Sequence, residues 1–320
     1  NKSTNFNYQS EAMLLELRAP HNERLSIELP VEAAHLGTPF NGSLCAEDGQ
    51  LFSIDRNIVQ LVENKRTFDT LAQLSNHVPV TAQVYEDLWR RRSIGLLSGE
   101  DFSLEEEKKL MLDWTEPKGG EKILDVGCST AFYARSLQDY EPGAQTVALD
   151  LSLPMLQKAR EKAVEEEVDL FLLQADARQL PFFSDTFDLV AMGGTLNEVS
   201  NTAQVLTEIR RVLRPNGRFF IMYLLKSTHW LGRVAQESSS LGGLHYWTYE
   251  ESKNLFKGAG FTIDRVETKG IVAFALLVGT WRCVAHPHSK SPQGTYLILS
   301  TLAAKSSGAS MPVSYTHLTL

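Results

Sequence analysis

Residues 121 to 131, Glu-Lys-Ile-Leu-Asp-Val-Gly-Cys-Ser-Thr-Ala, decide the fold of this chain. The apolar run Ile123–Val126 is typical of a buried strand; it carries Asp125 near its end and stops at Gly127. A helical pattern begins directly afterwards, with Phe132 available to pack against a sheet. A strand, a tight glycine turn and a helix in this order place free backbone N–H groups beside a carboxylate. Such a turn suits a nucleotide-like ligand.

The spacing of glycines argues against two common nucleotide sites. A dinucleotide fingerprint has glycines at the positions that Gly127, Ser129 and Phe132 occupy here. Phe132 opposes the close helix–strand contact that the last glycine allows, and Ser129 crowds the approach of a pyrophosphate. No Gly-Lys-Ser/Thr follows the turn, so the P-loop is absent too.

The same alternation of strand and helix continues along the chain. The second strand ends at Asp150, and Pro154 suits the first turn of the helix that follows it. Two capping boxes, at Ser103 and at Thr248, predict further helix starts. The sequence also predicts a turn at 214–217, a helix at 202–213, an irregular segment at 226–247, and strands at 145–149, 170–173, 187–190, 218–225, 261–267 and 271–281.

Four stretches of sequence occur in the order and at the spacing of a known family. They are ILDVGCSTA at 123–131, ALDLSLPML at 148–156, QADARQLPFFSDTFDLV at 174–190 and RVLRPNGRFF at 211–220. The chain resembles the class I S-adenosylmethionine-dependent methyltransferases, especially the methyltransferase type 11 group and its cyanobacterial and plastid members. This resemblance implies an α/β fold with a Rossmann-like, seven-stranded, mostly parallel sheet that carries helices on both faces.

The resemblance also implies how S-adenosyl-L-methionine would be held. Asp150 would accept the ribose hydroxyls, and a charged acceptor contributes roughly 1.5–3 kcal/mol per hydrogen bond. Asp176 and Ala177 would meet the adenine amine edge, while Asp125 and Gly127 would face the methionine portion. The alternative is that these aspartates are ordinary strand-end turn residues. The full set predicted for the cofactor is Asp125, Gly127, Cys128, Ser129, Ala131, Asp150, Leu151, Asp176, Ala177 and Met192.

Contacts to the methyl acceptor are predicted from aromatic and histidine residues beyond the strand ends. Tyr85 and Trp89 would close over the ligands as a lid, or else belong to an amphipathic helix that buries the Trp89 ring. The other predicted acceptor residues are His229, Tyr246 and Trp247. The catalytic group stays unknown; the candidates are Asn197, Glu198 and His245, although a lone histidine is more often a packing or surface residue.

Composition limits the class of protein. The chain has 320 residues, 43% of them hydrophobic and 22% charged, as in globular proteins. A net charge of −8 argues against nucleic acid as a partner. Three widely spaced cysteines, Cys45, Cys128 and Cys283, indicate reduced thiols. We predict a cytoplasmic protein (or a plastid one, if the chain is processed) without a transmembrane segment; peripheral membrane contact and oligomeric state stay open.

The sequence divides into four predicted parts. Residues 1–64 resemble the second half of a small zinc-ribbon module; because only Cys45 remains of its ligands, with Asp48 where a cysteine would stand, we expect no metal. Its core is predicted to be Leu44, Leu51, Phe52, Ile54 and Ile58. A helical connector or lid at 65–112, a cofactor-binding domain at 113–288 and a disordered or non-native tail at 289–320 follow.

The predicted function is methyl transfer from S-adenosylmethionine to a small acceptor. The acceptor is expected to be aromatic or prenylated and quinone-like, and the transfer an in-line displacement. Two alternatives remain: methylation of guanine in ribosomal RNA, and a non-catalytic protein that binds the cofactor or assists assembly. Ser129 and Ala131 keep the second alternative open, because the family usually has glycine there.

Overall fold

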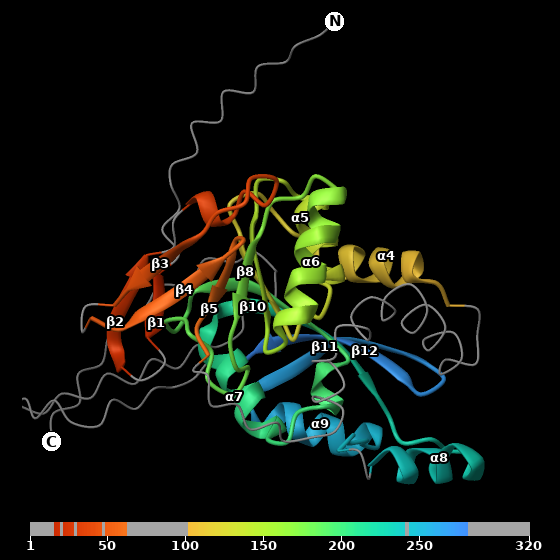
Figure 1. Cartoon of the computed structure of the whole chain (residues 1–320). Coiled ribbons are helices and arrows are strands. Elements are labelled where there is room, and N and C mark those ends of the chain that lie inside the picture. The colour runs from red at the N-terminus through yellow and green to blue at the C-terminus, as the bar shows by residue number, and fades with distance from the viewer. Residues whose placement is uncertain are drawn as a thin grey trace, which may run out of the picture. The chain divides into compact units, whose positions relative to one another are not determined.

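The computed structural model describes residues 16–19, 22–28, 31–46, 49–62, 102–240 and 243–280 (Figure 1). The predicted lid residues Tyr85 and Trp89, the tail 289–320 and Cys283 lie outside these residues.

One ten-stranded sheet organises the described residues, in the order β11-β12-β10-β9-β6-β7-β8-β5-β4-β3. The five adjacent strands β10, β9, β6, β7 and β8 run parallel to one another. β12 is antiparallel to both of its neighbours, β10 and β11. The predicted α/β class is confirmed, but the predicted count of seven strands is too low, because three N-terminal strands extend the sheet past β8. The bounds of the seven are β6 Lys122–Val126, β7 Gln145–Asp150, β8 Phe171–Gln174, β9 Phe187–Gly193, β10 Leu213–Leu224, β11 Phe261–Lys269 and β12 Val272–Gly279.

Helices cover both faces of this sheet. Apolar side chains of α4, α5 and α6 pack on one face, and those of α7 and α9 on the other. Both predicted capping boxes are confirmed: Ser103 begins α4 and Thr248 begins α9, each with a glutamate at the third helical position. The helices are α4 Leu104–Thr115, α5 Phe132–Tyr140, α6 Leu153–Glu165, α7 Thr202–Val212, α8 Trp230–Ser240 and α9 Tyr249–Gly258, with a short η3 at Thr195–Asn197.

Two local predictions after β9 were wrong. The segment 226–247 is not wholly irregular, because it contains α8. Its Gln236 is buried and fixes the helix to the end of β10, accepting from Ser227 N at 2.8 Å and donating to Leu225 O at 2.9 Å. Residues 214–217 are not a turn before a strand but a bulge inside β10, since Leu213 pairs with Phe187 and the next pair is Arg218 with Leu189.

The N-terminal residues build two small strand groups. β1 (Glu16–Ala19) pairs with β2 (Asn22–Glu28), and after η1 (Val31–Ala33) the strands β3 (Gly42–Cys45), β4 (Leu51–Asp55) and β5 (Ile58–Gln60) join the main sheet. Of the predicted ribbon core, Leu44, Phe52, Ile54 and Ile58 are buried. Leu51 is 66% exposed, so its assignment was wrong: the alternation along β4 turns it to solvent. The boundary at residue 64 stays a prediction, because residues 63–101 lie outside the described part.

The turn after β6 contains three residues in the left-handed region, Gly127 (φ 65°), Ser129 (φ 53°) and Ala131 (φ 60°). A Cβ atom at Gly127 would lie 2.3 Å from Cγ2 of Thr195, so only glycine fits. The turn is held to β7, because Cys128 N donates to Leu149 O at 3.0 Å and Ser129 N donates to Asp150 Oδ2 at 2.7 Å. These bonds fix where α5 begins.

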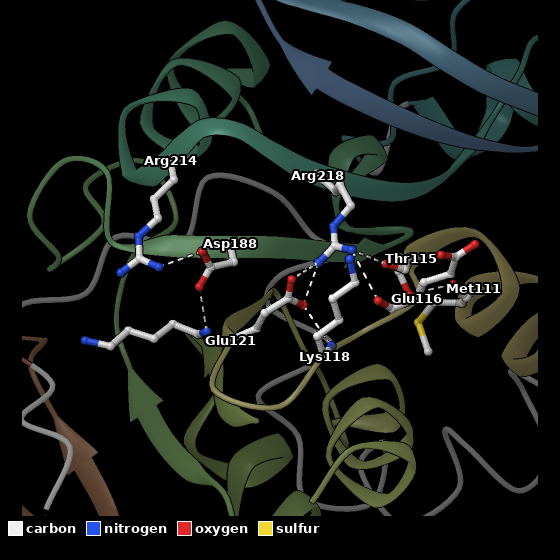
Figure 2. A network of polar contacts seen from close by, with 9 residues as sticks. Met111, Thr115, Glu116, Lys118, Glu121, Asp188, Arg214 and Arg218 are labelled. Carbon is white, nitrogen blue, oxygen red and sulfur yellow. Dashed lines mark hydrogen bonds and ion pairs between the residues drawn. The ribbon is translucent and has the colours of Figure 1, made fainter. Parts of the chain in front are cut away.

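A polar network fixes the opposite end of β6 (Figure 2). Arg218 Nη2 lies 2.6 and 2.5 Å from the two carboxylate oxygens of Glu121, and Arg218 Nη1 donates to Thr115 O at 2.5 Å. Because Thr115 ends α4 and Glu121 immediately precedes β6, this one guanidinium holds the helix, β6 and β10 together. A second pair, Arg214 with Asp188, lies beside it in Figure 2.

Arg218→Ala should lower the free energy of unfolding by about 2–3 kcal/mol, because it leaves the half-buried Glu121 carboxylate and the Thr115 carbonyl without their donor. Arg214→Ala is the matched control. Its side chain is 42% exposed, compared with 19% for Arg218, so its loss should stay near about 1 kcal/mol or less. Urea unfolding measures the loss of stability in both variants. Equal losses would contradict the larger effect expected for Arg218→Ala.

Ser129→Gly should raise the free energy of unfolding by about 1 kcal/mol, because it removes a Cβ atom from a left-handed backbone position. Ser129→Ala is the control: it removes the same hydroxyl but keeps the strained Cβ, so it should bring no gain. Thermal and urea unfolding compare the two variants, and a glycine variant no more stable than the alanine variant would contradict the strain argument.

Candidate functional site

A cleft lies across the carboxyl ends of β6, β7, β8 and β9, where ligands bind in open α/β sheets. Its empty volume, which includes the solvent-open mouth of the cleft, is about 760 Å³. The residues that line it are Gly127, Ser129, Leu149, Asp150, Leu151, Ser152, Ala175, Asp176, Ala177, Arg178, Gly193, Thr195, Glu198 and Val199.

Asp150 is a carboxylate of the cleft that backbone N–H groups hold in place. Its Oδ2 accepts from Ser129 N at 2.7 Å and its Oδ1 from Ser152 N at 2.8 Å. Burial raises the pKa of the Asp150 carboxyl above its ordinary value, and the backbone N–H groups partly oppose this. Each oxygen has lone pairs beyond the one it uses, so the two can accept a pair of neighbouring hydroxyl groups, as ribose carries.

Asp176 faces the cleft with an arginine that sequence reasoning missed. Arg178 Nε lies 3.0 Å from both carboxylate oxygens of Asp176, and Arg178 Nη2 lies 2.6 Å from Oδ2. The Arg178 backbone N–H also donates to Oδ1 at 2.8 Å. The pair therefore places a guanidinium plane and a carboxylate side by side at this wall of the cleft. The sequence signal for Arg178 was its position two residues after Asp176, in the run Asp-Ala-Arg.

The other residues predicted for the cofactor fall into two groups. Gly127, Ser129, Leu151 and Ala177 line the cleft with Asp150 and Asp176. Asp125, Cys128, Ala131 and Met192 are buried and do not line it.

Two of the buried residues have structural surroundings that explain their burial. Asp125 Oδ2 accepts from Ala134 N at 3.0 Å and so caps the first turn of α5. Burial, together with the charges of Asp150 and Asp125, raises the pKa of the Cys128 thiol well above its ordinary value. Cys128 is therefore a protonated packing group and not a nucleophile.

Of the three catalytic candidates, only Glu198 lines the cleft. Asn197 is buried, and its amide joins segments of backbone: Nδ2 donates to Leu224 O at 3.0 Å and to His245 O at 2.6 Å, and Oδ1 accepts from Leu224 N at 2.9 Å. His245 is exposed, and its backbone N–H donates to Asn197 O at 2.8 Å. Asn197, directly before Glu198, thus ties the backbone at His245 to the end of β10.

Of the predicted acceptor residues, the three that the structure describes do not line this cleft. His229 is exposed just before α8, and Tyr246 is half-buried. Trp247 packs against the main core and forms an isolated bridge with Leu225, since Lys226 N donates to Trp247 O at 2.8 Å.

The cleft residues that the sequence did not predict are Leu149, Ser152, Ala175, Arg178, Gly193, Thr195 and Val199. All of them are at or directly beyond a strand end, so the rule that places ligands at strand ends was the available signal. Within the described ranges, no helix has the length and apolarity needed to cross a membrane. The same residues contain no cluster of three His, Cys, Asp or Glu side chains that could hold a metal.

The sequence matches known proteins in this same region. The family model described as a methyltransferase domain matches residues 124–221. The chain is 35% identical over 117 residues to the ubiquinone/menaquinone biosynthesis C-methyltransferase UbiE of Paracoccus denitrificans, a match that covers 36% of this chain and 47% of that protein. The match therefore spans about half the length of that relative.

A second relative and a solved structure extend the comparison. The demethylmenaquinone methyltransferase of Lactiplantibacillus plantarum is 31% identical over 164 residues, which cover 43% of this chain and 69% of that protein. The phosphoethanolamine N-methyltransferase 2 of Haemonchus contortus, solved with phosphomonomethylethanolamine and S-adenosylhomocysteine, has the same fold, with a TM-score of 0.52 and 20% identity over 68% of this chain and 49% of that one. The sheet order, the cleft and these relatives agree: the chain belongs to the class I S-adenosylmethionine-dependent methyltransferases, and its cofactor is S-adenosylmethionine.

Proposed function

We propose that this chain transfers the methyl group of S-adenosylmethionine to a small, quinone-like acceptor. The observation that carries the proposal is the Asp150 carboxylate, which two backbone N–H groups hold at the cleft with lone pairs to spare for ribose hydroxyls. A lone aspartate at a strand end is common in α/β proteins. An aspartate that is fixed by backbone N–H groups and lines a cleft at the strand ends is a stronger argument for a binding role.

The remaining cleft residues fit the rest of the cofactor. Leu151 and Ala177 offer apolar surface to an adenine ring, while Asp176 and Arg178 offer polar groups to its edge. Gly127 and Ser129 border the part of the cleft that would take the methionine portion. When bound, the cofactor supplies a methyl group that is activated by its attachment to a positive sulfonium.

The charges near the cleft suit such a ligand. Asp150 and Glu198 line it, and the buried Asp125 lies behind the turn, so a cation is favoured there. Because the methyl group is already activated, orientation of the acceptor for in-line displacement and exclusion of water would provide much of the rate. An acceptor that must lose a proton would need a base, and Glu198 at the cleft wall is the candidate.

The acceptor class is supported by the relatives' names, which refer to ubiquinone, menaquinone and demethylmenaquinone. The match to the Paracoccus protein covers 36% of this chain, and the family model ends at residue 221. The segment after β10, with its aromatic residues Tyr246 and Trp247, lies past that limit. We expect the residues that determine which acceptor this chain methylates to lie in this segment.

The affinity for S-adenosylmethionine should fall as the pH falls through the raised pKa of Asp150, because only the ionised carboxylate accepts both ribose hydroxyls. The loss should therefore begin at a higher pH than an ordinary aspartate, with a pKa of about 3.9, would give. Asp150→Asn should bind about 100-fold more weakly and lose this pH dependence. Calorimetry in acidic to neutral buffers measures both, with Asp188→Asn, at the other end of the sheet, as the control. Unchanged affinity in Asp150→Asn would remove the cofactor assignment.

Purified protein should transfer the label from methyl-labelled S-adenosylmethionine to a component of a lipid and quinone extract, with release of S-adenosylhomocysteine. Mass spectrometry identifies the labelled product, and Glu198→Gln tests the proposed base. Ribosomal RNA serves as the competing substrate. Transfer of label to RNA alone would contradict the proposed acceptor and indicate RNA instead. Binding of S-adenosylmethionine without any release of S-adenosylhomocysteine would indicate a non-catalytic cofactor-binding protein.

A further inference from the structure

Residues 175–182 form one wall of the cleft, and both ends of this wall pair with the N-terminal part of the chain. The wall begins after β8 and contributes Ala175, Asp176, Ala177 and Arg178 to the cleft. Most strand-end loops in a sheet of this kind are supported only by the neighbouring βα units. Here the supporting backbone comes from more than a hundred residues earlier in the sequence.

The first end of the wall is held by β5. Ile58, Val59 and Gln60 pair in parallel with Leu172, Leu173 and Gln174 of β8, respectively. The pairing continues one residue beyond, because Leu61 N donates to Gln174 O at 2.9 Å. Gln174 is the residue immediately before the wall.

Gln174 also transmits this support across the cleft. Its buried side chain donates from Nε2 to Leu151 O at 2.9 Å, and Leu151 follows Asp150 on the opposite side of the cleft. The next residue, Ala175, donates its backbone N–H to Asp150 O at 3.1 Å. A shift of β8 would therefore move the backbone around Asp150 as well as the wall.

The second end of the wall is held by β1. Leu17 forms an antiparallel bridge with Phe182, and both side chains are fully buried. They belong to one apolar cluster with Val59 and Leu61 from the N-terminal segment and Leu180 from the wall itself. Backbone pairing and side-chain packing thus join the same two parts of the chain.

A third contact fixes the N-terminal segment to α6. Asn57 is buried, and its Nδ2 donates to the carbonyls of Glu32, His35 and Thr38 at 3.1–3.3 Å. Arg160 of α6 then donates from Nη2 to Leu36 O at 2.8 Å and from Nε to Asn57 Oδ1 at 3.3 Å. The segment is therefore attached to the helix that follows Asp150 as well as to the wall.

We infer that the N-terminal segment 16–62 is a positioning element for the adenine side of the cofactor cleft, and that it acts by fixing the wall 175–182 at both ends. Without β5, β8 would be an edge strand with unpaired backbone groups, and the wall would have to be ordered by the cofactor at a cost in conformational entropy. This inference depends on the proposed cofactor site. It adds that cofactor affinity is coupled to the N-terminal pairing.

Coupling of this kind is reciprocal, so the cofactor should also stabilise the N-terminal pairing. Hydrogen exchange of the full, unmodified chain tests this with saturating S-adenosylhomocysteine. Uptake of deuterium should fall in 175–182 and also in 16–19 and 58–62, while β11 at the far edge of the sheet should not change. A fall confined to 175–182 would overturn the inference and leave the cofactor site intact. If deuterium uptake does not fall in 175–182, both the inference and the proposed cofactor site are contradicted.

Point variants in the full chain provide the second test. Leu17→Ala should weaken binding of S-adenosylmethionine and of adenosine alone by about tenfold, because it loosens the wall without touching either ligand. Leu277→Ala is the matched control: it removes an equally buried leucine from β12, and binding should stay within about twofold. Equal effects of the two variants at equal loss of stability would show a general effect of destabilisation and would refute the inference.

Discussion

The hydrogen bond from the Ser129 backbone to the Asp150 carboxylate is the constraint on which the rest of the structure depends. It joins the turn after β6 to the end of β7, and so it fixes three consecutive features: the left-handed backbone of the turn, the start of α5, and the orientation of the acid. The carboxylate does not merely cap the turn. Because a carboxylate has about four lone-pair sites, backbone N–H groups such as those of Ser129 and Ser152 leave acceptor capacity for a ligand.

Burial of this acid has a cost that the surrounding chain must offset. Removing a carboxylate from water disfavours its charged form, which is why the pKa of Asp150 is raised. Backbone N–H groups supply the hydrogen bonds that water no longer provides, and the β-sheet pairing of the neighbouring strands fixes them. In the proposed site, the protein therefore keeps a charged group at the expense of stability, as binding sites commonly do.

Much of the fold could be predicted because its signals are local. Apolar runs ending in Asp125 or Asp150 predicted the strands, and the serine and threonine capping boxes located two helix starts correctly. The errors concern features that depend on tertiary contacts: α8 is attached through the buried Gln236, and Leu51 faces solvent because of its register with β3. In the site, strand-end residues were predictable, whereas the Arg178–Asp176 pair and the backbone ties of Asn197 depend on how side chains meet in space.

The extension of the sheet past β8 changes which strand edges are open to other chains. A parallel central strand with an uncovered edge would attract other chains, and the chain covers that edge with its own β5. At the far end, β11 carries a bulge between Ile263 and Arg265 and has charged side chains at Asp264, Arg265, Glu267 and Lys269. Kinked and charged borders are poor templates for intermolecular strand pairing, so this outer strand protects the protein against aggregation.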